Sequence, residues 1–317
     1  MSDKNGYVLV IGSSNMDLNI YSERLPKPGE TVTGGIFKQF LGGKGANQAI
    51  ASVRAGAKTI FIGKIGNDFF GDQMVSRLTK EGIDKSHIIK DAQEASGVAF
   101  IMIDNNGENM ISVAPGANAR LNPLEIQAKS DIIKKAKVLV VQMELSIETI
   151  EEIYRIASQG DVIKILNPAP LKPIPISVLK NIDIIIPNEG ELFRLHSLLE
   201  FKELSGTQKE KIIQASKDIA SLGIKIVITT LGSKGCLIVE NDEVIEIPAF
   251  KVEAIDTVGA GDCFNGVLAS KLCQDEPLLN AVKYATAAAS IAVTRKGAQE
   301  SMPFIHEIDE QFKKFRK

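Results

Sequence analysis

The sequence has no tryptophan, and aromatic residues make up only 5% of its 317 positions. Proteins that bind single-stranded nucleic acid stack the bases on aromatic side chains, so this scarcity argues against that class. The charges nearly cancel, with 37 basic and 39 acidic residues. No excess of positive charge is available to attract nucleic acid or an anionic membrane surface. We therefore expect neither nucleic acid nor a membrane among the partners.

Cysteine is also scarce, because the chain has only Cys236, Cys263 and Cys273. None of them forms a CxxC pair, and an odd number gives no disulfide framework. No run of about 18 apolar residues is present to cross a bilayer. The N-terminus starts as a first strand and lacks the basic start and apolar core of a signal peptide. These absences predict a cytoplasmic protein without structural zinc.

The second half of the chain alternates short apolar segments with helical ones. Hydrophobic residues make up 44% of the sequence, enough for a large core. The predicted strands are 138–141, 163–166, 182–186 and 224–229, and the predicted helices lie near 123–135, 146–159 and 207–221. Unbroken runs of Val, Ile and Leu between helices are typical of a buried parallel sheet. The pattern predicts an α/β fold of the Rossmann-like kind, with a central, mostly parallel sheet flanked by helices.

The first half of the chain predicts a second, smaller sheet. Its strands are 15–21, 34–41, 97–103 and 109–114, the last two joined through the hairpin signal Asn106-Gly107. We expect these strands, within residues 13–43 and 96–117, to form a β-sheet lid that projects from the core. The alternative is a local flap with no role. No repeat or linker divides the chain, so residues 1–317 are predicted to be a single domain.

Polar side chains follow three strands of the predicted parallel sheet, where ligands collect in such folds. They are Gln142 with Glu144, Asn167, and Asn188 with Glu191. Glu144 either reaches a ligand or caps a helix. Asn188 and Glu191 lie three residues apart at a helix start, so they share one face. They are either a capping pair or a ligand-binding pair.

The stretch from 254 to 266, AIDTVGAGDCFNG, combines a glycine-rich turn with a helix start. Gly259 and Gly261 leave room for a ligand, and the backbone N–H groups of the turn suit an anion. Asp262 stands at the same helix start. A carboxylate beside a phosphate is useful if it faces a hydroxyl that attacks phosphorus. The alternative is an Asp that only caps the helix.

A second glycine-rich stretch, GGKGANQ at 42–48, precedes a predicted helix over 46–54. It is neither a P-loop nor a dinucleotide fingerprint, because the required spacing is missing. It indicates a close approach of the backbone to a polar ligand. Upstream, Asn15 and Asp17 lie on one face if that segment is extended, so they can bind a polyol. The alternative is a solvated edge strand.

Three segments in this order, GGKGANQ, NEGE and DTVGAGD, resemble the signatures of the ribokinase-type (phosphofructokinase-B) sugar kinases. The resemblance covers nearly the whole chain and implies the ribokinase-like fold. It implies transfer of a phosphoryl group from ATP to the 5-hydroxyl of D-ribose, giving D-ribose 5-phosphate and ADP, with Asp262 as the base. The sugar-binding residues that it implies are Asn15, Asp17, Gly43, Lys44, Gly45, Ala46, Asn47, Glu144 and Asp262.

The resemblance also implies sites for ATP and for two metal ions. The implied nucleotide-binding residues are Asn188, Thr230, Leu231, Gly232, Ser233, Lys234, Gly235, Gly259, Ala260, Gly261 and Thr286. Thr286 stands where relatives often have histidine. Magnesium is expected near Asn188 and Glu191. Potassium is expected at Asp256, Val258, Ala292, Arg295, Gly297 and Ser301, mostly through backbone oxygens.

The family resemblance leaves the acceptor and the assembly open. The alternatives are a kinase for deoxyribose, fructose, adenosine or pseudouridine, and a non-catalytic sugar-sensing protein. The presence of both Asp262 and the glycines argues against the sensing protein. The resemblance further implies a homodimer formed through the lid sheets.

Overall fold

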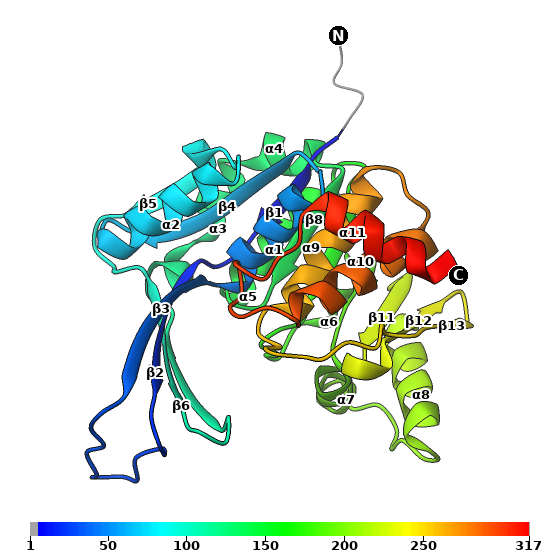
Figure 1. Cartoon of the computed structure of the whole chain (residues 1–317). Helices are drawn as coiled ribbons and strands as arrows, with labels where there is room; N and C mark the ends of the chain where they lie inside the picture. Colours follow the sequence, from blue (N-terminus) through cyan, green and yellow to red (C-terminus); the bar gives the residue numbers. More distant parts are fainter. Residues whose placement is uncertain (1–5, 317) are drawn as a thin grey trace.

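The computed structural model describes residues 6–316 and contains a nine-stranded sheet with a separate four-stranded sheet (Figure 1). The order of the large sheet is β13-β12-β11-β10-β9-β8-β1-β4-β5. Neighbouring strands from β11 to β5 run parallel, and β12 and β13 pair antiparallel at one edge. The strands are β1 (Val8–Ile11), β4 (Thr59–Gly66), β5 (Ile88–Asp91), β8 (Val138–Gln142), β9 (Ile163–Asn167), β10 (Ile184–Ile185), β11 (Ile226–Thr230), β12 (Cys236–Glu240) and β13 (Glu243–Ile247).

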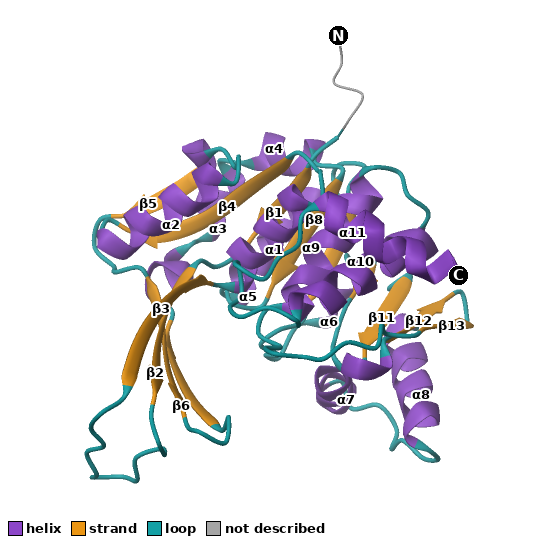
Figure 2. Ribbon diagram, in the orientation of Figure 1, coloured by secondary structure: helices purple, strands orange, loops and turns teal. Residues whose placement is uncertain are grey.

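Helices cover both faces of this sheet (Figure 2). They are α1 (Lys44–Arg54), α2 (Phe69–Lys80), α3 (Pro123–Gln127), α4 (Ser130–Lys135), α5 (Ile147–Ala157), α6 (Ile176–Leu179), α7 (Glu189–Leu198), α8 (Gln208–Ala220), α9 (Ala260–Cys273), α10 (Leu278–Ala292) and α11 (Ile305–Phe312). Alternate residues of each strand enter opposite cores. In β1, Val8 and Val10 pack with α1, α9 and α10, whereas Leu9 and Ile11 pack with α5 and α8. Burial on both faces explains the unbroken apolar strands.

The four-stranded sheet has the order β3-β2-β6-β7 and hangs away from the main body (Figure 1). Its strands are β2 (Asn15–Tyr21), β3 (Ile36–Gly42), β6 (Gly97–Ile103) and β7 (Asn109–Ala114). The β2–β6 pair is parallel, and the other two pairs are antiparallel. Because β2 follows β1 and β3 leads into α1, this sheet is attached next to the start of α1.

The predicted fold class is confirmed, and the differences are local. The helix predicted over 123–135 is two helices, because the chain turns at Ala128 and Lys129 between α3 and α4. The strand predicted over 182–186 shortens to β10, since the N–H of Ile182 bonds the Leu179 carbonyl and closes a turn after α6. The sequence analysis also missed β5, β13, α6 and α11. Within residues 6–316 no helix is long and apolar enough to cross a bilayer.

Candidate active site

The turn before α9 has the geometry of an anion site. Gly259 is the N-cap of α9 with φ 75°, a left-handed conformation that favours glycine. No described atom lies within 4 Å of the place that a side chain at Gly261 would take. The N–H groups of a first helical turn have no helical partners and lie at the positive end of the helix dipole. The turn therefore presents N–H donors to an open space, as an anion requires.

Asp262, in the first turn of α9, is only 6% exposed. Its Oδ2 accepts a hydrogen bond from Asn47 Nδ2 at 2.9 Å, and its Oδ1 accepts one from Gln48 Nε2 at 2.9 Å. Both donors belong to the first turns of α1, so the packing of α1 on α9 joins two distant motifs. The Asp262 side chain is thus held by a neighbouring helix and does not cap its own.

The start of α1 is shaped by its glycines and by Glu144. Gly43 has φ 88°, and a side chain there would lie 2.6 Å from the Ser14 Cα, so the chain needs glycine at this point. The N–H of Lys44 donates to Glu144 Oε2 at 3.0 Å, and the Ser13 hydroxyl donates to the same oxygen. Glu144 therefore joins the ends of β1 and β8 to α1, while Ser146 caps α5.

Asn15 and Asp17 lie on one face of β2, as their spacing predicted. Asn15 Oδ1 accepts a hydrogen bond from Asn118 Nδ2 at 2.8 Å, which leaves the Asn15 NH2 group as the end available to a ligand. Burial, together with the negative charges of Glu144, Asp262 and Glu300, raises the pKa of the Asp17 carboxyl to about 7. Asp17 thus shares one electrostatic environment with Glu144 and Asp262.

Lys44 supplies positive charge to this group of carboxylates. The Asp262 carboxylate raises the pKa of the Lys44 ammonium, against the opposing effect of burial, and Glu144 and Glu191 add to the rise. Burial raises the pKa of Glu191, which Lys44 partly offsets. A cation placed among carboxylates at the edge of an anion turn is suited to hold phosphate oxygens.

Of the predicted nucleotide residues, Asn188 and the segment 230–235 lie next to each other after β10 and at the end of β11. Asn188 and Glu191 form a capping box at the start of α7, with bonds of 2.8 and 2.9 Å, so their capping alternative is realised. Asn188 also pairs with Thr230, and Leu231 to Gly235 close a tight turn. Thr286 is buried in α10, where its hydroxyl donates to the Val282 carbonyl at 2.9 Å, and its side chain contacts the Cys236 thiol directly after this turn.

The segments predicted to hold potassium also lie side by side. The N–H of Ile255 bonds the Val293 carbonyl at 2.7 Å. Asp256 accepts the N–H of Val258 with one oxygen and the N–H of Gly297 with the other, both at 3.0 Å. The sequence thus correctly placed 256–258 beside the segment after α10. Of the remaining predicted ligands, Ser301 donates to the Ala298 carbonyl at 2.8 Å.

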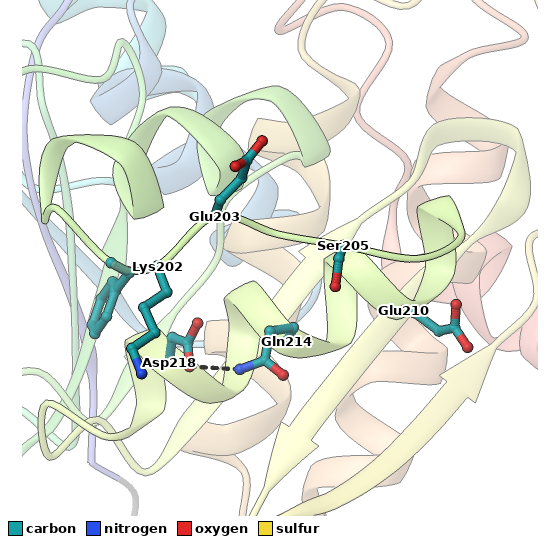
Figure 3. A pocket seen from close by; sticks show the side chains of 7 residues that line it. Lys202, Glu203, Ser205, Glu210, Gln214 and Asp218 are labelled. Carbon is teal, nitrogen blue, oxygen red and sulfur yellow. Dashed lines mark hydrogen bonds between the residues drawn. The ribbon is translucent and has the colours of Figure 1, made fainter.

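Two hollows in the described part of the chain bear on the site. One, of about 720 Å³, lies between the four-stranded sheet and the loops 254–258 and 296–298, and Asp17, Asp256 and Val258 line it. The other, of about 600 Å³, lies beside α8 (Figure 3). Its lining includes Lys202, Glu203, Gln214 and Asp218. None of the predicted site residues is among the residues that line this second hollow, so we do not assign it to the site.

Sequence reasoning missed three residues of this constellation: Gln48, Asn118 and Ser13. Gln48 stands in the quoted motif GGKGANQ, and its position beside Asn47 on a helix start was a usable signal. Ser13 follows the predicted first strand, where ligand-binding residues gather. Nothing in the sequence pointed to Asn118, because it lies 103 positions from Asn15 and contacts it only in the folded chain.

Comparison with known proteins agrees with this geometry. The sequence profile of the pfkB family carbohydrate kinases matches residues 5–305. The chain is 39% identical over 294 residues to a ribokinase of Haemophilus influenzae, covering 93% of this chain and 94% of the relative. It is 35% identical over 304 residues to a deoxyribokinase of Salmonella typhi, covering 96% and 97%. The structure of Arabidopsis thaliana ribokinase complexed with ribose and ATP matches with a TM-score of 0.90 at 31% identity, covering 98% of this chain and 99% of that chain.

Proposed function

This chain belongs to the pfkB family of carbohydrate kinases and is a sugar kinase, and we propose that its acceptor is the 5-hydroxyl of D-ribose. ATP is the phosphoryl donor, and the products are D-ribose 5-phosphate and ADP. One observation carries the proposal: the buried Asp262 carboxylate lies beside an anion-binding turn and is held by two amides of the GGKGANQ helix. The ribokinase relatives and the neighbour with ribose and ATP support it.

In the proposed mechanism Asp262 is the general base. A carboxylate offers about four lone-pair positions, and the amides of Asn47 and Gln48 use two of them. The remaining positions accept the proton of the sugar hydroxyl. The hydroxyl oxygen then forms a bond to the γ-phosphorus while the bond to the β-phosphate oxygen breaks. The N–H groups of Gly259 to Asp262, together with Lys44, stabilise the charge on the transferred group.

The sugar site is proposed to be the group of polar residues between β2 and α1. Asn15 presents its NH2 group, a donor suited to the oxygen of a 2-hydroxyl, because Asn118 occupies its carbonyl. Asp17, Asn47 and Glu144 add acceptors and a donor, and the backbone of Gly43, Lys44, Gly45 and Ala46 closes around the sugar. A second candidate is 2-deoxyribose, since a deoxyribokinase is 35% identical.

The nucleotide site is proposed to run from the anion turn toward the end of β11. Gly259, Ala260 and Gly261 would hold phosphate oxygens. Asn188 and the turn from Thr230 through Leu231, Gly232, Ser233 and Lys234 to Gly235 would lie along the rest of the nucleotide. Their contiguity supports this assignment, because Asn188 pairs directly with Thr230. Thr286 is kept as a residue near the adenine, because its side chain contacts Cys236, directly after this turn.

Magnesium fits the residues at the start of α7. Glu191 Oε2 accepts the N–H of Asn188, whereas Oε1 forms no hydrogen bond within the described part of the chain. One free carboxylate oxygen suits Mg²⁺, which keeps several waters and takes few protein ligands. When bound, this ion neutralises charge on the phosphate oxygens. Glu191 and Asn188 would hold it through its waters.

Potassium fits the residues around Asp256. Every proposed position supplies an oxygen, from the Asp256 carboxylate, the Ser301 hydroxyl or the carbonyls of Val258, Ala292, Arg295 and Gly297. Oxygen ligands are those that hard cations take. The hydrogen bonds of Asp256 already bring the two segments together. When bound, this ion would stabilise the position of the turn that carries the N–H donors.

The four-stranded sheet is proposed to act as a lid within a single kinase domain and as the surface of a homodimer. One of its faces lines the 720 Å³ hollow, so the sheet is placed to exclude water from the reaction. It also leaves apolar side chains more than half exposed on both faces: Ile36, Ile111 and Val113 on the face of the hollow, and Phe37 and Phe100 on the opposite face. The face that carries Phe37 and Phe100 is proposed as the dimer surface, because exposed apolar side chains are typical of an interface. Light scattering on wild type and on Phe100→Lys tests the dimer, which the charge should weaken.

The cysteines support a reducing, cytoplasmic setting for this reaction. All three thiols are free and buried. Burial raises the pKa of Cys236 to about 12 and that of Cys263 still further from its ordinary value. Thiols kept protonated in this way are unreactive and serve as core residues.

An ATP-consumption assay with several acceptors tests the proposed function. The acceptors are ribose, 2-deoxyribose, fructose, adenosine and pseudouridine. We expect the highest kcat/KM with ribose. A higher value with 2-deoxyribose would reassign the acceptor within the family. No acceptor-dependent consumption of ATP with any of them would favour the sugar-sensing alternative.

A further inference from the structure

A series of hydrogen-bonded side-chain amides links the ends of two strands of the large sheet to Asp262. Gln142 Nε2, at the end of β8, donates to Gln48 Oε1 at 2.7 Å. Gln48 Nε2 donates to Asp262 Oδ1 at 2.9 Å and to Asn167 Oδ1 at 3.1 Å. Asn167 Nδ2, at the end of β9, donates to the Ile186 carbonyl at 3.0 Å. Gln48 is therefore the centre of a network that joins two strand ends to the base.

The direction of every bond in this network follows from its two fixed acceptors. The Ile186 carbonyl can only accept, so Asn167 must turn its NH2 group toward it and its oxygen toward Gln48. The ionised Asp262 also only accepts. Gln48 must then point its NH2 group at both Asn167 and Asp262, and its own oxygen must accept from Gln142. The network has one consistent orientation.

This arrangement is buried and leaves one polar atom without a hydrogen bond. Gln48 and Gln142 are fully buried, and Asn167 is 7% exposed. Gln142 Oε1 is buried with no hydrogen-bond partner in residues 6–316. A buried acceptor without a partner costs about 1–3 kcal/mol. Such a local penalty, two hydrogen bonds away from Asp262, is typical of a functional site.

We propose that Gln48 is a positioning residue for the catalytic base, with Gln142 fixing the orientation of its amide. The inference rests on the proposed role of Asp262. Asn47 and Gln48 hold the two carboxylate oxygens from one helix, so together they fix the plane of the carboxylate. Asn47 also belongs to the proposed sugar site, whereas Gln48 lies behind it. Loss of Gln48 should therefore affect the chemical step and leave sugar binding largely intact.

The first test separates kcat from KM. Gln48→Ala should lower kcat by about 10- to 100-fold, because displacing a reacting group by about 1 Å costs about that much. KM for the acceptor should change less than threefold. Gln142→Met should also lower kcat, by a smaller factor, although Gln142 touches neither Asp262 nor the proposed substrate site. Unchanged kcat in both variants would overturn the proposal.

A matched control distinguishes positioning from a loss of stability. Ser52 is fully buried on the same helix and accepts a hydrogen bond from the Thr59 hydroxyl at 3.0 Å. Ser52→Ala removes that partner from α1 without touching Asp262. We expect Gln48→Ala and Ser52→Ala each to lower the melting temperature, but only Gln48→Ala to lower kcat of the folded enzyme. An equal loss of kcat in Ser52→Ala would show that α1 acts only through its stability.

A double-mutant cycle decides whether Gln48 acts through Asp262. The four proteins are wild type, Gln48→Ala, Asp262→Asn and the double variant, assayed with the best acceptor of the panel. If Gln48 only positions the base, it should change kcat less than twofold once Asp262 is Asn. A full 10-fold or greater loss in both backgrounds would overturn the proposal. Wild-type activity of Asp262→Asn would instead refute the assigned base, so the two failures are distinguishable.

Discussion

The carboxylate of Asp256 accepts the backbone N–H of Gly297 at 3.0 Å across 41 positions of sequence. Its second oxygen accepts the N–H of Val258, directly before the anion turn. One side chain thus couples the turn to the segment after α10. A cation bound at that segment would therefore act on the N–H groups that are proposed to hold phosphate.

This coupling predicts activation by potassium. At equal ionic strength, turnover should be highest in potassium chloride, because the proposed cage of oxygens would suit potassium better than the smaller sodium and would not admit choline. Choline controls for screening of exposed charges. Asp256→Ala should reduce turnover and abolish the difference between the salts. Identical wild-type rates in all three salts would contradict the assignment of Asp256, Val258, Ala292, Arg295, Gly297 and Ser301.

The raised pKa of Asp17 predicts that the stability of the protein depends on pH. Its pKa in the folded protein is raised to about 7 from an ordinary 3.8, so the folded state binds this proton more tightly than the unfolded chain. The free energy of unfolding should therefore fall as pH rises from about 4 to about 7. Asp17→Asn removes this cost and should raise the melting temperature at pH 8 but not at pH 4. The exposed Asp161→Asn is the control, and a pH-independent effect of Asp17→Asn would contradict the prediction.

Asn15 should discriminate between sugars. Its NH2 group would donate to a 2-hydroxyl, and leaving such a group unpaired costs about 1–3 kcal/mol, or roughly 10- to 100-fold. Asn15→Ala should therefore lower kcat/KM for ribose more than for 2-deoxyribose. Asn19→Ala, on the same face of β2, is the control and should affect both sugars alike. Equal losses in Asn15→Ala would show that it does not bind the 2-hydroxyl.

Arg54 should stabilise the join between α1 and the segment after α10. Its guanidinium pairs with Glu81 at 2.6 Å and donates to the carbonyls of Gln299 and Met302 at 3.0 and 2.7 Å. The side chain is 8% exposed, and breaking a buried pair costs about 3–5 kcal/mol. Arg54→Gln should lower the midpoint of urea unfolding strongly. Arg24→Gln removes the exposed pair with Glu30 and should change the midpoint far less.

The sequence predicted the architecture because its signals were local and repeated. Apolar runs between helices indicated the parallel sheet, and Asn106-Gly107 indicated the hairpin, whose strands have the predicted bounds. Short elements escaped prediction because contacts create them. Strand β5 is one example, because it pairs with residues 63–66 of β4, which lie 25 positions earlier in the sequence.

The site was predictable as motifs but not as a geometry. The residue types and their order pointed to a base and an anion turn, and the family resemblance implied two metal sites. They could not tell which neighbours would hold each side chain, since Asn118 reaches Asn15 and Gln48 reaches Asp262 only through folding. The capping alternative for Asn188 and Glu191 was also open in the sequence, and the structure shows that they cap α7.

The central claim is that Asp262 removes the proton of the sugar hydroxyl. The most direct measurement is acceptor-dependent ATP consumption by Asp262→Asn, with calorimetry of sugar binding on the same protein. The amide fills the same space but cannot accept the proton, so kcat should fall by roughly 10²-fold or more while sugar affinity changes little. Turnover near that of wild type would contradict the account.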